Sequence, residues 1–398
     1  MGCSSLSIGI VGAGTAGPAA AVYLARAGHA VELLERAPRN LPVGAGFLLQ
    51  PTGMHVLEDL GLLNDLLPKT RAIRRLTCLD SRHHALFDLH YGELSPRLFG
   101  AGTHRAALLG LLLAAAEQAG TRVRWGREVV ALERTSTGRP RLRDAKGDEH
   151  GPYDLVLCCD GAQSALRAQA GIPVRVDRYP WGALWFIGRR PEAFAPDTLW
   201  QRVGTTRELV GFLPTGTEAD LLSFFWSIRL DQVAAWRSAP LETWKREVVR
   251  LVPQAAGLLD QVKDHSQLAV AAYHDVRLPR WHAERVAILG DAGHALSPQL
   301  GQGVNLALMD AAELASALSR HSTLAAALAD FSARRRRHLA FYQWSTRWLT
   351  PFFQSDHQAL GRARDLLFPW FAKIPWLRRE MVKTMAGLKT GLFAQLPP

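Results

Sequence analysis

The hydrophobic pattern near the start of the chain predicts a strand, a tight turn, a helix and a second strand. An apolar run at 8–11 enters the sequence GAGTAG at 12–17, and small residues then continue as a helix that Gly28 ends. A second apolar run at 30–34 follows and stops at Glu35. This order of signals is typical of a unit that binds the pyrophosphate of a dinucleotide.

Three glycines give that turn its chemistry. Gly12 permits the tight turn, Gly14 lets a pyrophosphate approach the backbone, and Gly17 lets the helix pack closely on the strand. The N–H groups at the helix start would bind the phosphates, because the helix dipole is positive there. Glu35 stands where an acidic side chain accepts hydrogen bonds from a ribose. A glycine turn in an ordinary α/β unit is the alternative.

Further apolar patterns extend the fold along the chain. Alternating segments predict strands at 74–80 and 85–90, and a wide apolar face predicts a buried helix at 106–119. A meander is expected from four segments, 123–125, 128–134, 139–143 and 153–159. From 174 to 272 alternating, tryptophan-rich runs predict an antiparallel sheet with helices beside it.

Polar clusters follow two more buried strands. Asp160-Gly161 comes after the run at 153–159, and Gly290-Asp291 comes after the run at 286–289. Gly301 and Gly303 precede a long alanine-rich helix and would offer backbone N–H groups to an anion or a carbonyl. Ligands of open α/β sheets bind at the carboxyl ends of strands, so three such ends predict one large cofactor.

Composition excludes several classes of protein. The chain has 398 residues, of which 48% are hydrophobic and 21% charged, as in globular proteins. A net charge of +11 raises the possibility of nucleic-acid binding, but dispersed arginines without a nucleic-acid motif favour a basic surface and an anionic cofactor. Four cysteines without framework or metal-ligand spacing indicate a reducing compartment and no metal. No signal or membrane-length run is seen, so a cytoplasmic protein is expected.

Together these motifs resemble those of the class A flavoprotein monooxygenases, which share the para-hydroxybenzoate hydroxylase fold. The matching motifs are GAGTAG with Glu35 and Arg36, Asp160-Gly161 with Ser164 and Arg167, and Gly290-Asp291 with the residues that follow it as far as Asn305. The dipeptide His104-Arg105 matches the family's flavin-contacting arginine at a helix start. The resemblance covers roughly residues 6–320.

The resemblance implies an α/β fold with α+β elements: a Rossmann-like FAD-binding domain, an inserted antiparallel-sheet substrate domain and a helical C-terminal tail. The FAD-binding domain would comprise residues 1–75, 99–175 and 273–330, the substrate domain residues 76–98 and 176–272, and the tail residues 331–398. The cofactor-binding residues that it implies are Gly12, Gly14, Thr15, Ala16, Gly17, Glu35, Arg36, Arg105, Val130, Asp160, Asp291, Pro298, Gly301, Gly303, Val304 and Asn305.

The implied reaction uses non-covalent FAD, with NADPH or NADH as a transient reductant. Reduced flavin captures molecular oxygen as a C4a-hydroperoxide, which hydroxylates or epoxidises an aromatic or polyketide-like small molecule. The motifs specify no catalytic acid or base. An FAD-dependent reductase or dehydrogenase without oxygen insertion, and a regulatory binding module, remain alternatives.

The sequence allows two interpretations for the aromatic residues of the predicted antiparallel sheet and two for the C-terminal tail. The aromatic side chains Trp185, Phe212, Phe224 and Trp226 line the substrate site or belong to an ordinary sheet core. The basic, aromatic tail covers the two domains or touches a membrane, as in related quinone-ring hydroxylases; the covering role is favoured.

Overall fold

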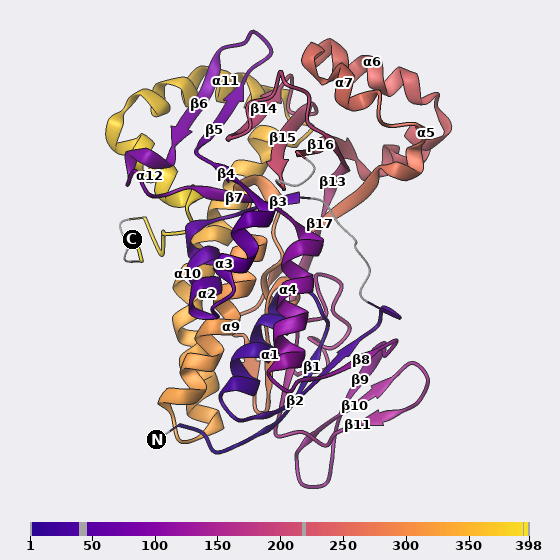
Figure 1. The fold of residues 1–398 in the computed structure, drawn as a ribbon, viewed down its shortest axis with the longest axis vertical. Helices are drawn as coiled ribbons and strands as arrows, with labels where there is room; N and C mark the ends of the chain where they lie inside the picture. Colours follow the sequence, from indigo (N-terminus) through magenta and orange to yellow (C-terminus); the bar gives the residue numbers. More distant parts are fainter. Residues whose placement is uncertain (1, 40–45, 217–219, 393, 397–398) are drawn as a thin grey trace.

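The computed structural model describes residues 2–39, 46–216, 220–392 and 394–396. Two large sheets dominate it (Figure 1). One sheet and its helices occupy the lower half of the view in Figure 1, and the other sheet lies at the top, with the C-terminal helices running along the left-hand side. The predicted α/β class, with a parallel sheet, an antiparallel-sheet domain and C-terminal helices, is confirmed.

The lower sheet is Rossmann-like. Its strands lie in the order β18 (His282–Ala283), β19 (Val286–Ile288), β12 (Leu155–Cys158), β1 (Ser7–Val11), β2 (Ala30–Glu35) and β8 (Arg122–Trp125). All of these pairings are parallel except that of β18 with β19. β12 and β19 are buried along their whole length because helices cover a parallel sheet, which explains their continuous apolar runs.

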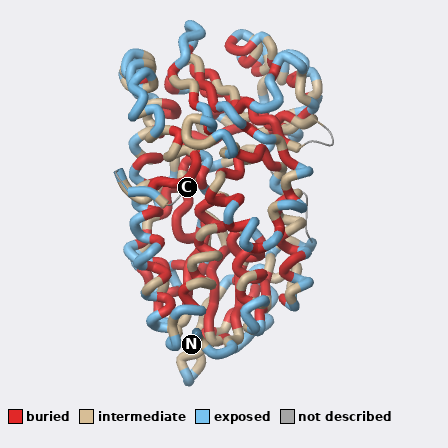
Figure 2. The backbone as a smooth tube through the Cα atoms, turned by 60° about the vertical axis from the view of Figure 1, so that its left-hand side comes forward, coloured by how far each residue is buried: buried red, intermediate tan, exposed pale blue. Residues whose placement is uncertain are grey.

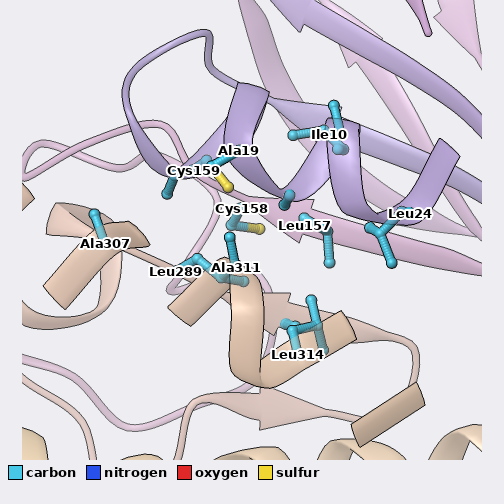
Figure 3. Packing of buried hydrophobic residues seen from close by; sticks show 14 of the residues in the cluster. Ile10, Ala19, Leu24, Leu157, Cys158, Cys159, Leu289, Ala307, Ala311 and Leu314 are labelled. Atoms are coloured by element: carbon cyan, nitrogen blue, oxygen red, sulfur yellow. The ribbon is translucent and has the colours of Figure 1, made fainter. Parts of the chain in front are cut away.

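Helix α1 (Ala16–Arg26) lies directly on this sheet. Its alanines at 19–21 are fully buried, and such small side chains allow a close approach of helix and strand. Helix α9 (Gly303–Arg320) packs beside α1, and Figure 3 shows Ala311 and Leu314 of α9 near Leu157 and Cys158 of β12. α4 (Arg105–Gln118) also contacts α1. This packing fixes the strand ends from which the site is built.

The predicted meander at 123–159 is wrong in its outer parts. Only β9 (Val129–Arg134), β10 (Pro140–Asp144) and β11 (Glu149–His150) form a separate three-stranded sheet. β8 pairs with β2, and β12 pairs with β1. The pattern misled because a short buried strand has the same apolar sequence whether it continues a hairpin or crosses into a parallel sheet.

The upper sheet has seven strands. Their order is β17 (Ala269–Arg277), β13 (Arg175–Arg189), β16 (Leu221–Arg229), β15 (Leu209–Thr215), β14 (Thr198–Val203), β5 (Arg75–Leu79) and β6 (Ala85–His90). All neighbours are antiparallel except β14 and β5. One face packs on α5 (Val233–Ser238), α6 (Leu241–Leu251) and α7 (Ala256–Leu259), which form its apolar core.

A small sheet joins the two halves. It consists of β3 (Gly46–Leu49), β7 (Gly100–His104) and β4 (Thr70–Ile73), and both β3 and β7 contact β15 of the upper sheet. Helices α2 (Pro51–Asp59) and α3 (Leu63–Leu66) follow β3. β7 leads directly into α4, so Arg105 stands at the first turn of that helix, as predicted.

The tail is helical, as predicted. It contains α10 (Leu324–Phe353), α11 (Gln358–Lys373) and α12 (Pro375–Met385). The fully buried Arg364 of α11 donates hydrogen bonds to the carbonyls of Phe352 and Gly204, which ties the tail to the upper sheet. Figure 2 shows the buried chain running through the centre of the molecule and the exposed chain at its outer edges. Within the described residues, no helix is long and apolar enough to cross a membrane.

Candidate active site

Three polar clusters meet at one edge of the Rossmann-like sheet. The strands that precede them, β19, β12 and β1, are direct neighbours in that sheet and run parallel. Their carboxyl ends therefore lie side by side, although they are far apart in the sequence. The predicted clustering of the GAGTAG turn, Asp160-Gly161 and Gly290-Asp291 is the geometry that the structure has.

The glycine turn leaves open space where the sequence predicts a pyrophosphate. Gly12 has φ of +104°, and a Cβ there would clash with the carbonyl oxygen of Cys159. A Cβ at Gly17 would clash with the carbonyl oxygen of Gly12. Gly14, in contrast, has nothing within 4 Å of the place of its missing Cβ. α1 begins with neither a side-chain cap nor an acidic residue, so its first N–H groups are available to an anion.

The carboxylate of Glu35 braces this turn. Its Oε2 atom accepts a hydrogen bond of 2.7 Å from the N–H of Ala13, and Oε1 accepts one of 2.8 Å from Ala37. Glu35 and its neighbour Arg36 both line the site cavity described below. Because each carboxylate oxygen can accept a second hydrogen bond, bracing the turn leaves Glu35 able to bind a ribose hydroxyl.

Asp160 lines the cavity and has one carboxylate oxygen without a hydrogen-bond donor. Its Oδ2 atom accepts a hydrogen bond of 3.0 Å from the N–H of Ala165, whereas Oδ1 is buried and has no partner among the described residues. A buried carboxylate oxygen without a donor is costly, so a ligand hydroxyl or N–H is expected there. Nearby, Arg167 donates to the carbonyl of Ala292 at 3.3 Å and so connects this loop to the one after β19.

The loop after β19 is held from behind by a buried ionic network. The N–H of Gly290 donates to Oδ2 of Asp310 at 2.8 Å, and Nε2 of His294 donates to the same oxygen at 2.6 Å. The other oxygen, Oδ1, accepts from Nε of Arg335 at 2.7 Å. Burial opposes ionisation of Asp310, but His294 and Arg335 together lower its pKa to about 2. Asp310 is therefore an anion at neutral pH.

The network continues into the tail. Nη1 of Arg335 donates to Nδ1 of His338 at 2.8 Å, and Nε2 of His338 donates to the carbonyl of Gly387 at 3.1 Å. Burial and the charge of Arg335 lower the pKa of His338 to about 3. Met385, two residues before Gly387, lines the cavity, and its carbonyl accepts from Gln302 at 2.7 Å. The tail thus forms part of the cavity wall, which the sequence motifs did not indicate.

The start of α9 supplies a second set of N–H groups. Gly301 adopts a left-handed conformation with φ of +61°, and α9 begins at Gly303 with no side-chain cap and no acidic residue in its first turn. Gly301, Gly303 and Val304 line the cavity, as does Pro298. Asp291, the first residue of the short helix α8 (Asp291–His294), also lines the cavity, with its Oδ1 atom 3.8 Å from the position of a Cβ on Gly303.

A single cavity of about 810 Å³ runs from these loops to the upper sheet. Predicted residues that line it are Gly12, Gly14, Thr15, Ala16, Glu35, Arg36, Arg105, Asp160, Trp185, Asp291, Pro298, Gly301, Gly303 and Val304. Predicted residues that do not line it are Gly17, Val130, Phe212, Phe224, Trp226 and Asn305.

The predicted residues that do not line the cavity have other positions in the fold. Gly17 packs against Gly12, and the side chain of Val130 is exposed while its neighbour Val129 lines the cavity. The fully buried side chain of Asn305 acts as a brace. Its Oδ1 atom accepts from the N–H of Gln50 at 2.8 Å, and Nδ2 donates to Gly301 at 3.2 Å. The side chain of Asn305 thus joins the end of β3 to the start of α9.

Phe212, Phe224 and Trp226 belong to the core of the upper sheet, the second of the two interpretations that the sequence allowed, and do not line the cavity. Phe212 and Phe224 are fully buried and their rings pack on each other, with Phe224 also against Trp244 of α6. Trp226 belongs to the same core. Side chains alternate along a strand, so the neighbour Phe225 points the other way and lines the cavity. The serines at 223 and 227, which alternate with these apolar residues and share the face of Phe225, are the sequence signal that separates the two faces.

Several cavity residues were missed altogether. They include Phe47, Gln50, Arg127, Gln163, Leu199, Gln201, Leu209, Leu213, Phe225, Ala271, Tyr273, Gln354 and Met385. Gln50 is notable because its side chain is fully buried: Oε1 accepts a hydrogen bond from Tyr91, while Nε2 has no partner among the described residues. In Tyr273, the hydroxyl accepts from Nε1 of Trp185 at 3.3 Å. For the missed residues on the strands of the upper sheet, the only available sequence signal was the alternation that places them on the same face as Trp185.

Fold and site together define a flavoprotein. The open space at Gly14, the two uncapped helix starts and the unsatisfied Asp160 oxygen fit the phosphates, carbonyls and hydroxyls of FAD. The family model described as an FAD binding domain matches residues 5–341, and the chain belongs to this family. It is an FAD-dependent monooxygenase of the class for which NAD(P)H is the typical reductant.

Known proteins resemble the chain over most of its length. A putative 2-heptyl-3-hydroxy-4(1H)-quinolone synthase from Rhodococcus erythropolis is 29% identical over 96% of this chain and 97% of the relative. A kynurenine 3-monooxygenase from Salinispora arenicola is 30% identical over 83% of this chain and 76% of the relative. The structure of P. aeruginosa PqsL in complex with 2-aminobenzoylacetate superposes with a TM-score of 0.79 at 25% identity, covering 90% of this chain and 99% of PqsL.

Proposed function

We propose that this enzyme uses NAD(P)H and molecular oxygen to hydroxylate or epoxidise an aromatic or polyketide-like small molecule. The observation that carries the proposal is the single cavity, which joins the strand ends of the FAD-binding half to one face of the upper sheet. Bound FAD supplies the redox and oxygen-transfer chemistry. The relatives support an aromatic substrate, since their names include a quinolone synthase and a kynurenine monooxygenase.

The chain's own residues bind and orient. Arg105 lies at the cavity beside the start of α4, where a cation is disfavoured by the helix dipole and gains from an anionic ligand. The uncapped N–H groups at the start of α9 would stabilise the negative charge that reduced flavin carries at its pyrimidine edge. Trp185 and Phe225, from neighbouring strands of the upper sheet, have ring centroids 5.1 Å apart and exclude water from the far end.

Labelled oxygen tests the reaction. With ¹⁸O₂ and a compound that accelerates NAD(P)H oxidation, one ¹⁸O atom is expected in the product, and an unlabelled product would refute oxygen insertion. Arg105→Ala and Asp291→Ala are expected to weaken FAD retention by roughly tenfold each, which is a typical loss for a charge-assisted contact. Arg337→Ala, a change of an exposed arginine on α10, is the matched control. Full FAD occupancy in both cavity variants would show that the assigned residues do not hold the cofactor.

The exposed aromatic side chains of the tail favour a second candidate, action at a membrane surface. Of the large hydrophobic residues described as exposed, most lie in the tail: Trp344, Trp348, Leu366, Leu367, Trp370, Phe371, Ile374, Trp376 and Leu392. All of these except Leu392 lie in the stretches 331–355 and 366–379, which contain arginine and lysine but no acidic residue. Tryptophan with basic neighbours suits an anionic lipid interface.

Vesicle sedimentation separates this candidate from a freely soluble enzyme. The holoenzyme is expected to sediment with phosphatidylglycerol vesicles and not with phosphatidylcholine vesicles. A variant with Trp344, Trp348 and Trp370 changed to Ser is expected to stay in the supernatant with unchanged FAD content. Equal behaviour of the wild type and this variant would leave only the covering role of the tail.

A further inference from the structure

The two ends of the cavity differ in charge. The charged side chains that line it, such as Glu35, Arg105 and Asp291, all come from elements of the FAD-binding half. The residues contributed by the upper sheet include no Asp, Glu, Lys, Arg or His among those that the structure describes. The sequence at 40–45 and 217–219, outside the described part, holds no Lys, Arg or His either.

The sheet end of the cavity is apolar with a few neutral polar groups. Trp185, Phe225 and Leu213 provide aromatic and aliphatic surface. The polar groups are the amides of Gln201 and Gln354 and the hydroxyl of Tyr273. Burial raises the pKa of Tyr273, so the phenol stays protonated, and because its oxygen already accepts from Trp185, its O–H is left to donate. Such groups offer hydrogen bonds to a carbonyl or a hydroxyl but no counter-charge.

A carboxylate bound at this end would be desolvated without a cation beside it. Isolated buried charges are far more expensive than neutral polar groups that find a hydrogen bond. An uncharged ring gains from burial on the aromatic surface and loses little at its carbonyl or hydroxyl. The arginines that line the cavity, Arg36, Arg105 and Arg127, follow β2, β7 and β8, and none of them stands on a strand of the upper sheet.

We propose that the substrate is an uncharged, largely apolar ring compound that carries a carbonyl or hydroxyl group and has no carboxylate. This inference rests on the proposed function, since it concerns the ring that the monooxygenase oxidises. It separates this enzyme from PqsL, whose structure contains the carboxylate-bearing 2-aminobenzoylacetate.

Matched pairs of rings test the proposal directly. The pairs are 4-hydroxyquinoline with 4-hydroxyquinoline-2-carboxylate, 2-aminobenzamide with 2-aminobenzoate, and 2-naphthol with 3-hydroxy-2-naphthoate. Equilibrium dialysis against the holoenzyme gives the dissociation constant, and NADPH and NADH oxidation gives the stimulation. In each pair that binds, the uncharged member is expected to bind at least roughly tenfold more tightly and to stimulate more. Equal or tighter binding of the carboxylates, or no binding by any uncharged member, would overturn the proposal.

A charge introduced at the sheet end should reverse the preference. Gln201→Lys is expected to tighten binding of the carboxylate members by roughly tenfold, because it supplies the missing counter-charge. Gln201→Met keeps the length without the charge and should preserve the wild-type ranking. FAD content and thermal midpoint show whether each variant is folded, and the wild-type ranking does not depend on either variant.

Failure of this inference is distinguishable from failure of the proposed function. Incorporation of ¹⁸O into a carboxylate-bearing ring that binds best would sink the inference and keep the monooxygenase reaction. An uncharged ring that binds best but yields unlabelled product would keep the inference about the ring and sink oxygen insertion.

Discussion

The two ends of the cavity are built by different means. The cofactor end consists of glycines, main-chain N–H groups and a carboxylate network around Asp310, which holds the loop after β19 by a hydrogen bond to Gly290. The sheet end consists of side chains that alternate along strands, with Trp185 and Phe225 on the cavity face. A phosphate requires fixed donors at fixed positions, whereas an apolar ring requires only surface of the right shape. The first end should therefore tolerate substitution far less than the second.

The largest effect is expected from Asp310→Ala. This change leaves Arg335 and His294 buried beside an empty site, and removing one partner of a buried pair costs roughly 3–5 kcal/mol. The loop at Gly290 also loses its acceptor, so FAD content should fall together with stability. Chemical denaturation of the holoenzyme and the ratio of flavin to protein absorbance measure the two losses.

Glu313→Ala is the control for this substitution. Glu313 is also an acidic residue of α9 that pairs with an arginine, but it lies at the surface and accepts from Arg320. Exposed pairs contribute roughly 0–1 kcal/mol, so little change is expected. If Asp310→Ala behaved like Glu313→Ala, the cofactor end would not depend on the buried network.

The next largest effect is expected from a comparison of substitutions on the two faces of the upper sheet. Phe224→Ala removes a fully buried ring that packs on Phe212 and Trp244, and we expect it to cost roughly 3–4 kcal/mol of unfolding free energy. Phe225→Ala changes the adjacent residue, whose ring faces the cavity, and should mainly weaken binding of an aromatic ring. Denaturation midpoints and ring dissociation constants measured on both variants test the assignment. Substrate affinity that falls in Phe224→Ala but not in Phe225→Ala would reverse the faces.

The difference between the cofactor end and the sheet end of the cavity also explains how much of the site could be predicted from the sequence. The roles of the glycines at 12, 14 and 17 were predictable because their spacing is typical of a phosphate-binding turn. The structure shows no room for a Cβ at Gly12 and Gly17, and open space at Gly14. The clusters at Asp160 and Asp291 were predictable because each follows a continuous apolar strand. The overall class followed from these signals and from the alternating pattern of the second sheet.

The sheet end was much less predictable. In β16 every second residue from Leu222 to Ile228 is apolar and buried, whereas the other face carries Ser223 and Ser227 beside Phe225. The alternation therefore indicates which face packs in the core, but not that the other face lines a cavity. Nor does the sequence near Met385 or Gly387 indicate contact with the cavity, because that contact depends on how the tail folds back through His338. Strand pairing misled at β8 for the same reason: the partner of a short strand is a tertiary property.

A pH-dependent effect, the smallest expected, tests whether the tail wall depends on His338. The pKa of this buried side chain is lowered to about 3 in the folded protein, against roughly 6.5 in an unfolded chain. Between these values the unfolded state binds more protons, so stability is lost as pH falls below about 6.5. Asp310, with a folded pKa of about 2, adds its own loss of stability only below about pH 4.

The variant His338→Gln retains a donor for Gly387 and an acceptor for Arg335 but does not titrate. Denaturation of both proteins from pH 7.5 to 4.5 should show a shallower decline in the variant, by at most about 2–3 kcal/mol at pH 4.5. Parallel curves would mean that folding does not lower the pKa of His338 and that another group sets the acid sensitivity of the cavity wall.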